Sequence, residues 1–300
     1  QKTAYEIMPS LVGSEMCIRD SLNYYLNYQR AYKTAYEVEQ LKAANKLAVT
    51  GHNAARDSFL NGGNEYQIHM AYLEACGMLE DESPYTNIVA LDKNSAILHY
   101  QYKNKSNGES SQVLLIDAGC RVNGYGSDVT RTSVKENVNS TFKDLLQGMV
   151  NVELELVGMV KPGVAYPEIH LAALFKISQL LIDLDICDGS AEEIMEKELS
   201  HLFMPHGVGH LLGIQVHDVG GHQKDIRGNT RAPPGHSPAL RNTRELSEGM
   251  VFTIEPGCYF IPLLLEAERH QERGKSINWN LVDELYPCGG IRVEDNILVT

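Results

Sequence analysis

The 300-residue sequence is short of basic residues, has no long apolar run and carries no dense cysteine pattern. Its 26 Lys and Arg residues stand against 39 Asp and Glu residues, which gives a net charge of -13. So much negative charge repels nucleic-acid phosphates and leaves no polybasic patch for a membrane surface. No apolar stretch reaches the roughly 20 residues that a membrane-spanning helix needs. We therefore expect a protein that binds neither nucleic acid nor membrane.

The six cysteines are scattered and include no C-x-x-C pair. This spacing excludes a zinc-thiolate site and is typical of reduced thiols, which predicts a cytoplasmic protein. The six are Cys17, Cys76, Cys120, Cys187, Cys258 and Cys288.

The first 20 residues have no helical period and lack the charged, apolar and cleavage regions of a signal peptide. They look foreign to the rest of the chain, and we interpret them as a disordered or artefactual leader.

Four helices are predicted further along the chain. The first runs from a capping box at Thr34 to Asn61, and the second from a similar box at Asn64 to Gly77. Two more are predicted over residues 139–160 and 169–184, with a break at Lys-Pro-Gly between them. Their apolar stripes imply that they cover a sheet.

A β-hairpin is predicted between the second and third of these helices. Val113–Ile116 is an aliphatic run typical of a buried strand, and Val129–Val134 alternates like its partner. Asn123-Gly124 between them is a strong hairpin-turn signal. Counting pairs outwards from that turn sets Asp117 diagonally across from Asp128 on one face, and directly opposite Thr130.

Two carboxylates on one face of a hairpin need an explanation. At about 4 Å they repel by roughly 4 kcal/mol at an effective dielectric near 20. A bound cation would remove that objection. The alternative is that both are solvated loop acids, and the pair alone does not decide between the two interpretations.

Three histidines, His206, His210 and His217, fall within twelve glycine-rich residues. Imidazole is the commonest metal ligand and the commonest proton shuttle near neutral pH. A histidine-bearing core turn is the competing interpretation. A zinc-binding H-x-x-x-H helix is disfavoured, because two glycines separate the first two histidines and no H-E-x-x-H glutamate is present.

Further strands are predicted over residues 84–91, 96–100, 250–257 and 289–297. His99 lies in one of these apolar segments, a setting that favours a hydrogen-bonded core histidine over a catalytic one. Residues 221–238 are polar and rich in Gly and Pro, which predicts a long surface loop.

Two of these strands carry glutamates. Glu255 ends an apolar strand as Asp117 does, although a plain strand-end charge would look the same. Alternation places Arg292 and Glu294 on one face and Asp295 on the other, so Glu294 is the predicted ligand. Each half of the chain thus offers helices and then a strand pair with two carboxylates, which predicts a pseudo-symmetric sheet with a metal site between the halves.

Four blocks together resemble the pita-bread metallopeptidases, most closely the bacterial Xaa-Pro dipeptidase (prolidase) branch with its organophosphorus acid anhydrolase relatives. They are LIDAGCRVNGYGSDVTRT, MPHGVGHLLGIQVHDVG, VFTIEPGCYF and GGIRVEDNILVT. The resemblance implies an α+β pita-bread fold, in which a curved, mainly antiparallel sheet with pseudo-two-fold symmetry is covered by helices.

The resemblance runs from about Leu22 to the C-terminus. It implies a catalytic domain over residues 34–300, preceded by a linker remnant over residues 21–33. Members of the family carry an N-terminal lobe before that linker and are homodimers, and we expect that this chain lacks the lobe.

By resemblance, two divalent metal ions are expected, manganese first and cobalt as the alternative. Asp128 and Glu294 would bridge the ions, Asp117 would bind one, and His210 and Glu255 would bind the other. Four carboxylates and one imidazole form a hard, oxygen-rich site of the kind that manganese suits.

The same resemblance implies hydrolysis of the peptide bond before proline in Xaa-Pro dipeptides. A metal-bridging hydroxide would be the nucleophile and Glu255 the general base, while His206 and His217 would stabilise the tetrahedral intermediate. Five more residues would contact the peptide substrate or its surroundings. His99 and Arg241 would hold the dipeptide carboxylate, Arg292 would orient the carboxylate ligands, and Tyr85 and Val216 would line the proline pocket.

Two competing interpretations are an aminopeptidase for longer Xaa-Pro peptides and a metal-free binding module or impaired fragment. The complete ligand set disfavours the binding module. Arg241 and the blocks SPYTNIVALDKNSAILHY and LRNTRELSEGMVFTIEPG favour the dipeptidase branch. A side activity on organophosphates is compatible with a two-metal site.

Overall fold

The structure is a computed structural model that describes residues 19–106 and 108–300. Residues 1–18 of the expected 20-residue leader therefore lie outside the described part of the chain, and its last two residues lie inside it. Residues 19–29 are helical, and two longer helices come next, α2 (Ala35–Leu60) and α3 (Glu65–Cys76). Capping boxes at Thr34 and Asn64 open α2 and α3, as predicted.

The first sheet has the strand order β1-β2-β5, from β1 (Ile88–Leu91), β2 (Val113–Asp117) and β5 (Thr130–Val134), and all its pairs are antiparallel. The hairpin strands β3 (Arg121–Val122) and β4 (Tyr125–Gly126) connect β2 to β5. Asp117 pairs with Thr130 and Val122 with Tyr125, which confirms the predicted register. Asn123 and Gly124 both have positive φ, 48° and 90°, as the tight turn requires.

The strand predicted over residues 96–100 was wrong, and the one over residues 84–91 is confirmed only from Ile88 onward. A 3₁₀ helix, η2 (Asp92–Ala96), follows β1 instead. Asp92 adopts a φ of 52°, and its Oδ1 accepts hydrogen bonds from the backbone N–H groups of Gln112 (2.8 Å) and Val113 (3.0 Å). This contact reverses the chain at once after β1. His99 consequently lies in an exposed turn and not in an apolar strand.

The second half begins with the helices α4 (Ser140–Gly158) and α5 (Tyr166–Asp183), which confirm the predicted pair, α5 starting three residues earlier than expected. Shorter elements complete the chain. They are η1 (Glu80–Glu82), α6 (Ala191–Glu196), α7 (Ser200–Phe203), α8 (Pro262–Leu265), η3 (Glu266–Glu268), η4 (Arg273–Ser276), α9 (Trp279–Leu285) and η5 (Tyr286–Cys288). Residues 221–238 form the predicted loop, without helix or named strand.

The two last predicted strands are each broken in two. β6 (Val251–Ile254) pairs with β9 (Asp295–Leu298), and β7 (Gly257–Tyr259) pairs with β8 (Gly290–Arg292). The first break falls at Glu255-Pro256, where proline has no N–H to give to a ladder. The second falls just before Asp295, so both predicted glutamate ligands stand at strand breaks.

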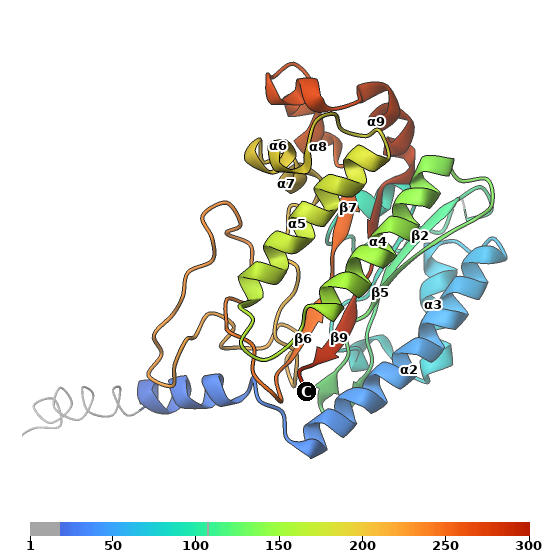
Figure 1. Cartoon of the computed structure of the whole chain (residues 1–300). Coiled ribbons are helices and arrows are strands. Elements are labelled where there is room, and N and C mark those ends of the chain that lie inside the picture. The colour runs from blue at the N-terminus through green and yellow to red at the C-terminus, as the bar shows by residue number, and fades with distance from the viewer. Residues whose placement is uncertain (1–18, 107) are drawn as a thin grey trace, which may run out of the picture.

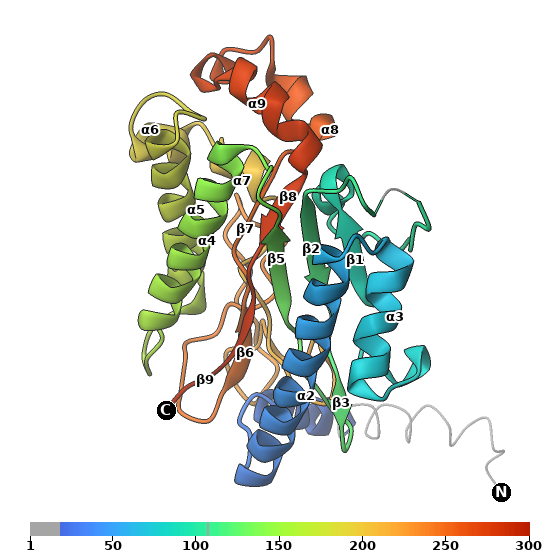
Figure 2. The same ribbon diagram turned by 90° about the vertical axis from the view of Figure 1, so that its right-hand side faces the viewer.

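The helices cover the strands in two groups (Figures 1 and 2). α2 and α3 pack on β1 and β2 around one hydrophobic cluster, while α4 packs on β6 and β8, and α5 packs on α4, around another. This arrangement agrees with the expected mixed α+β fold of two similar halves. Among the described residues, no helix is both long and apolar enough to cross a membrane.

Candidate metal centre and substrate cavity

Acidic residues from both halves meet where the halves join. Asp117 ends β2 and Asp128 precedes β5, while Glu255 follows β6 and Glu294 lies between β8 and β9. A backbone bridge pairs Thr130 with Glu294, whose N–H donates to the Thr130 carbonyl at 3.1 Å. The site is therefore built on the seam between the two halves.

The histidine segment runs antiparallel beside β6. Thr253 N–H donates to the His210 carbonyl at 2.9 Å, and His210 N–H donates to Thr253 Oγ1 at 3.1 Å. Gly209 has a φ of 150°, and a Cβ there would lie 2.2 Å from the Thr253 carbonyl oxygen. Only glycine allows this close approach, which sets His210 next to the end of β6.

Three buried side chains form the centre of the site. Ligand atoms of Asp128, His210 and Glu294 all lie within 4.8 Å of one another. His210 Nε2 is 3.3 Å from Asp128 Oδ2 and 3.6 Å from Glu255 Oε1. Its Nδ1 donates to the Leu211 carbonyl at 3.0 Å, so Nε2 is the nitrogen that faces the carboxylates.

The carboxylates are in an environment that opposes their charge. Burial raises the pKa of Glu255 to about 7, with His210 opposing the shift, and raises that of Asp117 to about 6. Burial and the neighbouring Asp128 charge raise the pKa of Glu294 well above its usual value. Burial lowers the pKa of His210, but its hydrogen bond to Asp128 and the negative charges of Glu255 and Asp128 together outweigh burial, and the net shift of the pKa is upward.

This donor set fits a divalent cation. Bound positive charge would relieve the repulsion among the buried carboxylates, and hard oxygen ligands suit such ions. A metal-binding histidine normally fixes its other ring nitrogen on a carbonyl or carboxylate, as His210 does with Leu211.

Arg292 links Asp117 to Tyr259 through hydrogen bonds. Its Nη2 donates to Asp117 Oδ2 at 2.6 Å and its Nη1 to the Tyr259 hydroxyl at 2.9 Å. The Tyr85 hydroxyl donates to the other Asp117 oxygen at 2.7 Å. Both oxygens of Asp117 are thus satisfied, which fits the orienting role expected of Arg292.

Sequence analysis missed two residues of this network, Tyr259 and Thr130. The Thr130 hydroxyl donates to Glu294 Oε2 at 2.6 Å and accepts from Arg292 Nε at 3.1 Å. Strand alternation from Glu255 would have put Tyr259 on the same face, because the two are four residues apart. Thr130 carried no such signal beyond its place opposite Asp117.

One cavity of about 480 Å³ brings together every site residue predicted from the sequence. The predicted ligands lining it are Asp117, Asp128, His210, Glu255 and Glu294, and the other predicted residues are Tyr85, His99, His206, Val216, His217, Arg241 and Arg292.

The two non-ligand histidines expected at the reaction differ in their surroundings. His206 is engaged at both ring nitrogens, Nδ1 by the Gly207 carbonyl at 2.8 Å and Nε2 by the Tyr259 hydroxyl at 3.0 Å. His217 makes no side-chain hydrogen bond to the described residues, and its ring packs edge-on against His210, with centroids 4.4 Å apart. Burial lowers the pKa of both His206 and His217 to about 4. A neutral His217 is therefore the freer of the two to bind a substrate group.

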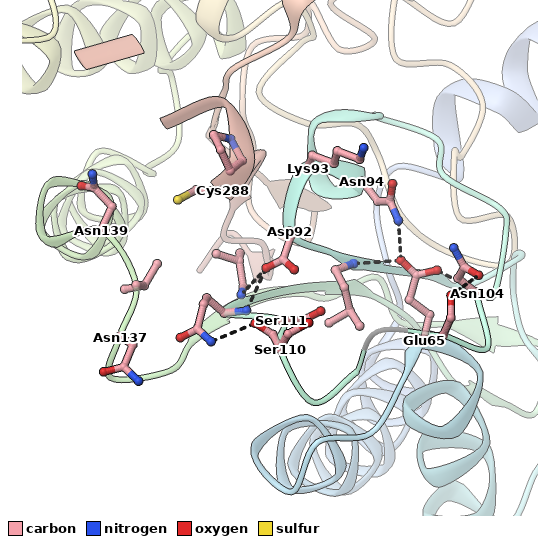
Figure 3. A pocket seen from close by; sticks show the side chains of 16 residues that line it. Glu65, Asp92, Lys93, Asn94, Asn104, Ser110, Ser111, Asn137, Asn139 and Cys288 are labelled. Atoms are coloured by element: carbon pink, nitrogen blue, oxygen red, sulfur yellow. Dashed lines mark hydrogen bonds between the residues drawn. The ribbon is translucent and has the colours of Figure 1, made fainter. Parts of the chain in front are cut away.

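A larger cavity of about 590 Å³ lies between η2, the start of α4 and η5 (Figure 3). Its carboxylates are already used by the fold. Glu65 accepts from Leu91 N–H at 3.0 Å and from the Tyr100 hydroxyl at 2.8 Å, and Asp92 holds the turn after β1. The described residues place no group of three metal-ligating side chains there.

Comparison with known proteins assigns the family. Residues 39–300 match the profile of metallopeptidase family M24. The chain belongs to this family. The M24 chain is 47% identical over 281 residues to a protein of Shewanella pealeana named Xaa-Pro dipeptidase, covering 93% of this chain and 63% of that protein. A Pseudoalteromonas atlantica protein of the same name is 47% identical over 290 residues, covering 96% and 66%.

Solved structures confirm the pita-bread fold of this M24 chain. Zinc-substituted Escherichia coli aminopeptidase P in complex with product superposes with a TM-score of 0.73 at 26% identity, over 91% of this chain and 55% of that one. Pseudomonas aeruginosa aminopeptidase PepP gives a TM-score of 0.72 at 27% identity, over 93% and 57%. The chain thus spans about three fifths of the length of the relatives that it matches.

Proposed function

We propose that this M24 chain hydrolyses the peptide bond before proline in Xaa-Pro dipeptides, with divalent metal ions. The observation that carries the proposal is one cavity that holds both a buried carboxylate–imidazole cluster and the basic side chains of Arg241 and His99. The 47% identity to proteins named Xaa-Pro dipeptidase supports it. Two ions would be held by Asp117, Asp128, His210, Glu255 and Glu294.

Manganese ions bound to this set of ligands would act as Lewis acids and would lower the pKa of a water molecule in the cavity. Glu255 lies in the same cavity, with its Oε1 3.6 Å from His210 Nε2, and would accept a proton from the attacking water. Attack forms a carbon–oxygen bond at the scissile carbonyl. Glu255 then passes the proton to the proline nitrogen, and the carbon–nitrogen bond breaks.

The remaining cavity residues would hold the dipeptide. Arg241 and His99 would bind its terminal carboxylate, for which the planar guanidinium gives two parallel hydrogen bonds. His217 would donate to the oxyanion of the tetrahedral intermediate. Val216 and Tyr85 would line the pocket for the proline ring.

A second candidate function is an aminopeptidase for longer peptides that carry proline in second position. The solved structures named aminopeptidase P favour this candidate, because the fold superposes on them over more than nine tenths of this chain. The higher identity to the dipeptidases favours the first candidate.

Release of alanine from Ala-Pro and from Ala-Pro-Gly tests the proposal. The purified protein is assayed with manganese and again after chelation. Cleavage of Ala-Pro alone, lost on chelation, is the expected result. Cleavage of both peptides would favour the aminopeptidase, and cleavage of neither by manganese-loaded protein would contradict the proposal.

A further inference from the structure

We propose that Lys33 and Asp218 are positioning residues for the cavity. They form a buried ion pair through which the segment of residues 24–33, which we call the brace, holds His217 beside His210 of the candidate metal site. The inference rests on the proposed function, because a position for His217 matters only if the cavity is a peptidase site.

The ion pair is almost completely shielded from water. Lys33 Nζ lies 3.1 Å from Asp218 Oδ2, and the two side chains are 1% and 2% exposed. Lys33 Nζ also donates to the Arg30 carbonyl, and Arg30 Nη2 lies 2.5 Å from Asp218 Oδ1. Burying such charges is costly, and an apolar pair of similar volume is often as stable. A role in fixing geometry explains the pair better than a gain in stability.

Asp218 transmits this constraint to its neighbour His217. Asp218 N–H donates to the Leu211 carbonyl at 2.9 Å, and Val219 N–H donates to Asp218 Oδ1 at 2.9 Å. Backbone and side chain of Asp218 are therefore both fixed. Its carboxylate points to Lys33, while the His217 ring points into the cavity and packs against His210.

The loop that carries His217 also packs closely against this pair at Gly213. A Cβ on Gly213 would lie 2.4 Å from Asp218 Oδ2 and 3.1 Å from Lys33 Nζ. The Gly213 carbonyl accepts from Gly126 N–H of β4 at 3.2 Å. The loop that carries His217 thus lies between the brace on one side and the hairpin strands β3 and β4 on the other.

The brace is itself anchored at several points. Lys33 N–H donates to the Gly249 carbonyl at 2.7 Å, next to β6. The Arg244 guanidinium lies 3.9 Å from the centre of the Tyr28 ring, and Gln223 Nε2 donates to the Tyr24 carbonyl at 3.1 Å. Figure 1 shows the helix of residues 19–29 beside the long loop that comes after His217. All of the brace precedes residue 39, where the family match begins.

A double-mutant cycle with His217 tests the proposal in the full chain. Lys33→Met is expected to lower kcat for Ala-Pro by about tenfold or more with KM changed by less than about threefold, because His217 acts on the transition state. In a His217→Ala background the same substitution is expected to change kcat by less than about twofold. The proposal would be overturned if Lys33→Met lowered kcat by the same factor in the His217→Ala background as in the parent protein, since Lys33 would then not act through His217.

Backbone hydrogen exchange gives a second readout that needs no activity. The amides of Asp218 and Val219 are expected to exchange about tenfold faster in Lys33→Met, and Lys33→Arg should restore protection. Lys42→Met is the matched control, because its pair with Glu39 is 66% and 67% exposed. Unchanged exchange at both amides would overturn the proposal even if the chain cleaves no dipeptide. If Lys33→Met does not fold, Arg30→Met can replace it, because Arg30 is the partly exposed partner of Asp218. Arg30→Met should change kcat and the two amide exchange rates in the same direction but by less.

Discussion

Single residues of the site differ in how well the fold satisfies their charge. Asp117 has a donor on each oxygen, Tyr85 and Arg292, which oppose the rise that burial causes in its pKa, to about 6. Among the described residues, Glu255 has just two long polar side-chain contacts, 3.4 Å from the Thr253 hydroxyl and 3.6 Å from His210 Nε2, and burial raises its pKa to about 7. Because it has fewer close hydrogen-bond donors than Asp117, Glu255 is the better candidate for the proposed general base.

Replacing Glu255 by Gln is expected to lower kcat for Ala-Pro by about 100- to 10,000-fold, the usual contribution of a general base. The amide keeps the size of the side chain and an oxygen for the metal, but it cannot accept the proton. Metal content by atomic absorption should stay near that of the parent protein. Glu248→Gln, at an exposed position, is the matched control and should leave kcat unchanged. Near-normal turnover of Glu255→Gln would exclude the role.

Secondary elements could be predicted where local signals decide them. The register of the β2–β5 hairpin followed from a two-residue period and one Asn-Gly turn, and the Thr34 cap fixed the start of α2. The break before Asp295 could not, because it depends on the pairing of Thr130 with Glu294 from the other half of the chain. The break at Glu255-Pro256 has a local cause in the proline, and the prediction overlooked it.

The candidate site was predictable for a related reason. Its predicted ligands stand at strand ends or in a glycine-rich turn, features that a sequence shows directly. The hydrogen bond from Thr130 to Glu294 and the Lys33–Asp218 pair depend instead on contacts between remote segments, which no local pattern predicts. The segment 96–100 failed for the same reason, since the turn at Asp92 depends on backbone groups 20 residues or more away.

Glycines in the helices give a prediction at this scale. A Cβ on Gly51 of α2 would lie 2.4 Å from Cys76 Sγ and 2.6 Å from the Tyr72 ring of α3, whereas one on Gly158 of α4 would meet nothing within 4 Å. Gly51→Ala is therefore expected to lower the free energy of unfolding by about 1 to 3 kcal/mol, the usual cost of overpacking. Gly158→Ala should raise it by up to about 1 kcal/mol through helix propensity. Urea unfolding of both variants measures the difference, and two shifts of the same sign would contradict the packing argument.

The described part of the molecule has two large hydrophobic cores, which meet along the seam that carries the carboxylate–imidazole cluster of Asp128, His210 and Glu294. Its net charge of -13 already disfavours compaction, and the seam concentrates carboxylates from both halves at one point. A cation bound by these carboxylates would therefore link the two halves. The free energy of unfolding should therefore depend on bound metal, and this dependence should change with pH.

That coupling has a definite sign. Without metal, the pKa values of Asp117 and Glu255 in the folded chain are about 6 and about 7, above their ordinary values of 3.8 and 4.5. The folded state then binds protons that the unfolded chain has released, so this contribution to stability is full below about pH 4 and is lost as pH rises through 6 to 7. Metal replaces those protons, and at 100 times its Kd it adds about 2.7 kcal/mol. We expect manganese to raise the melting temperature of chelated protein by several degrees at pH 8 and far less at pH 5. Asp128→Asn should remove most of the increment, while Asp183→Asn, at an exposed position, should keep it. An equal increment at both pH values would mean that the metal does not bind at these carboxylates.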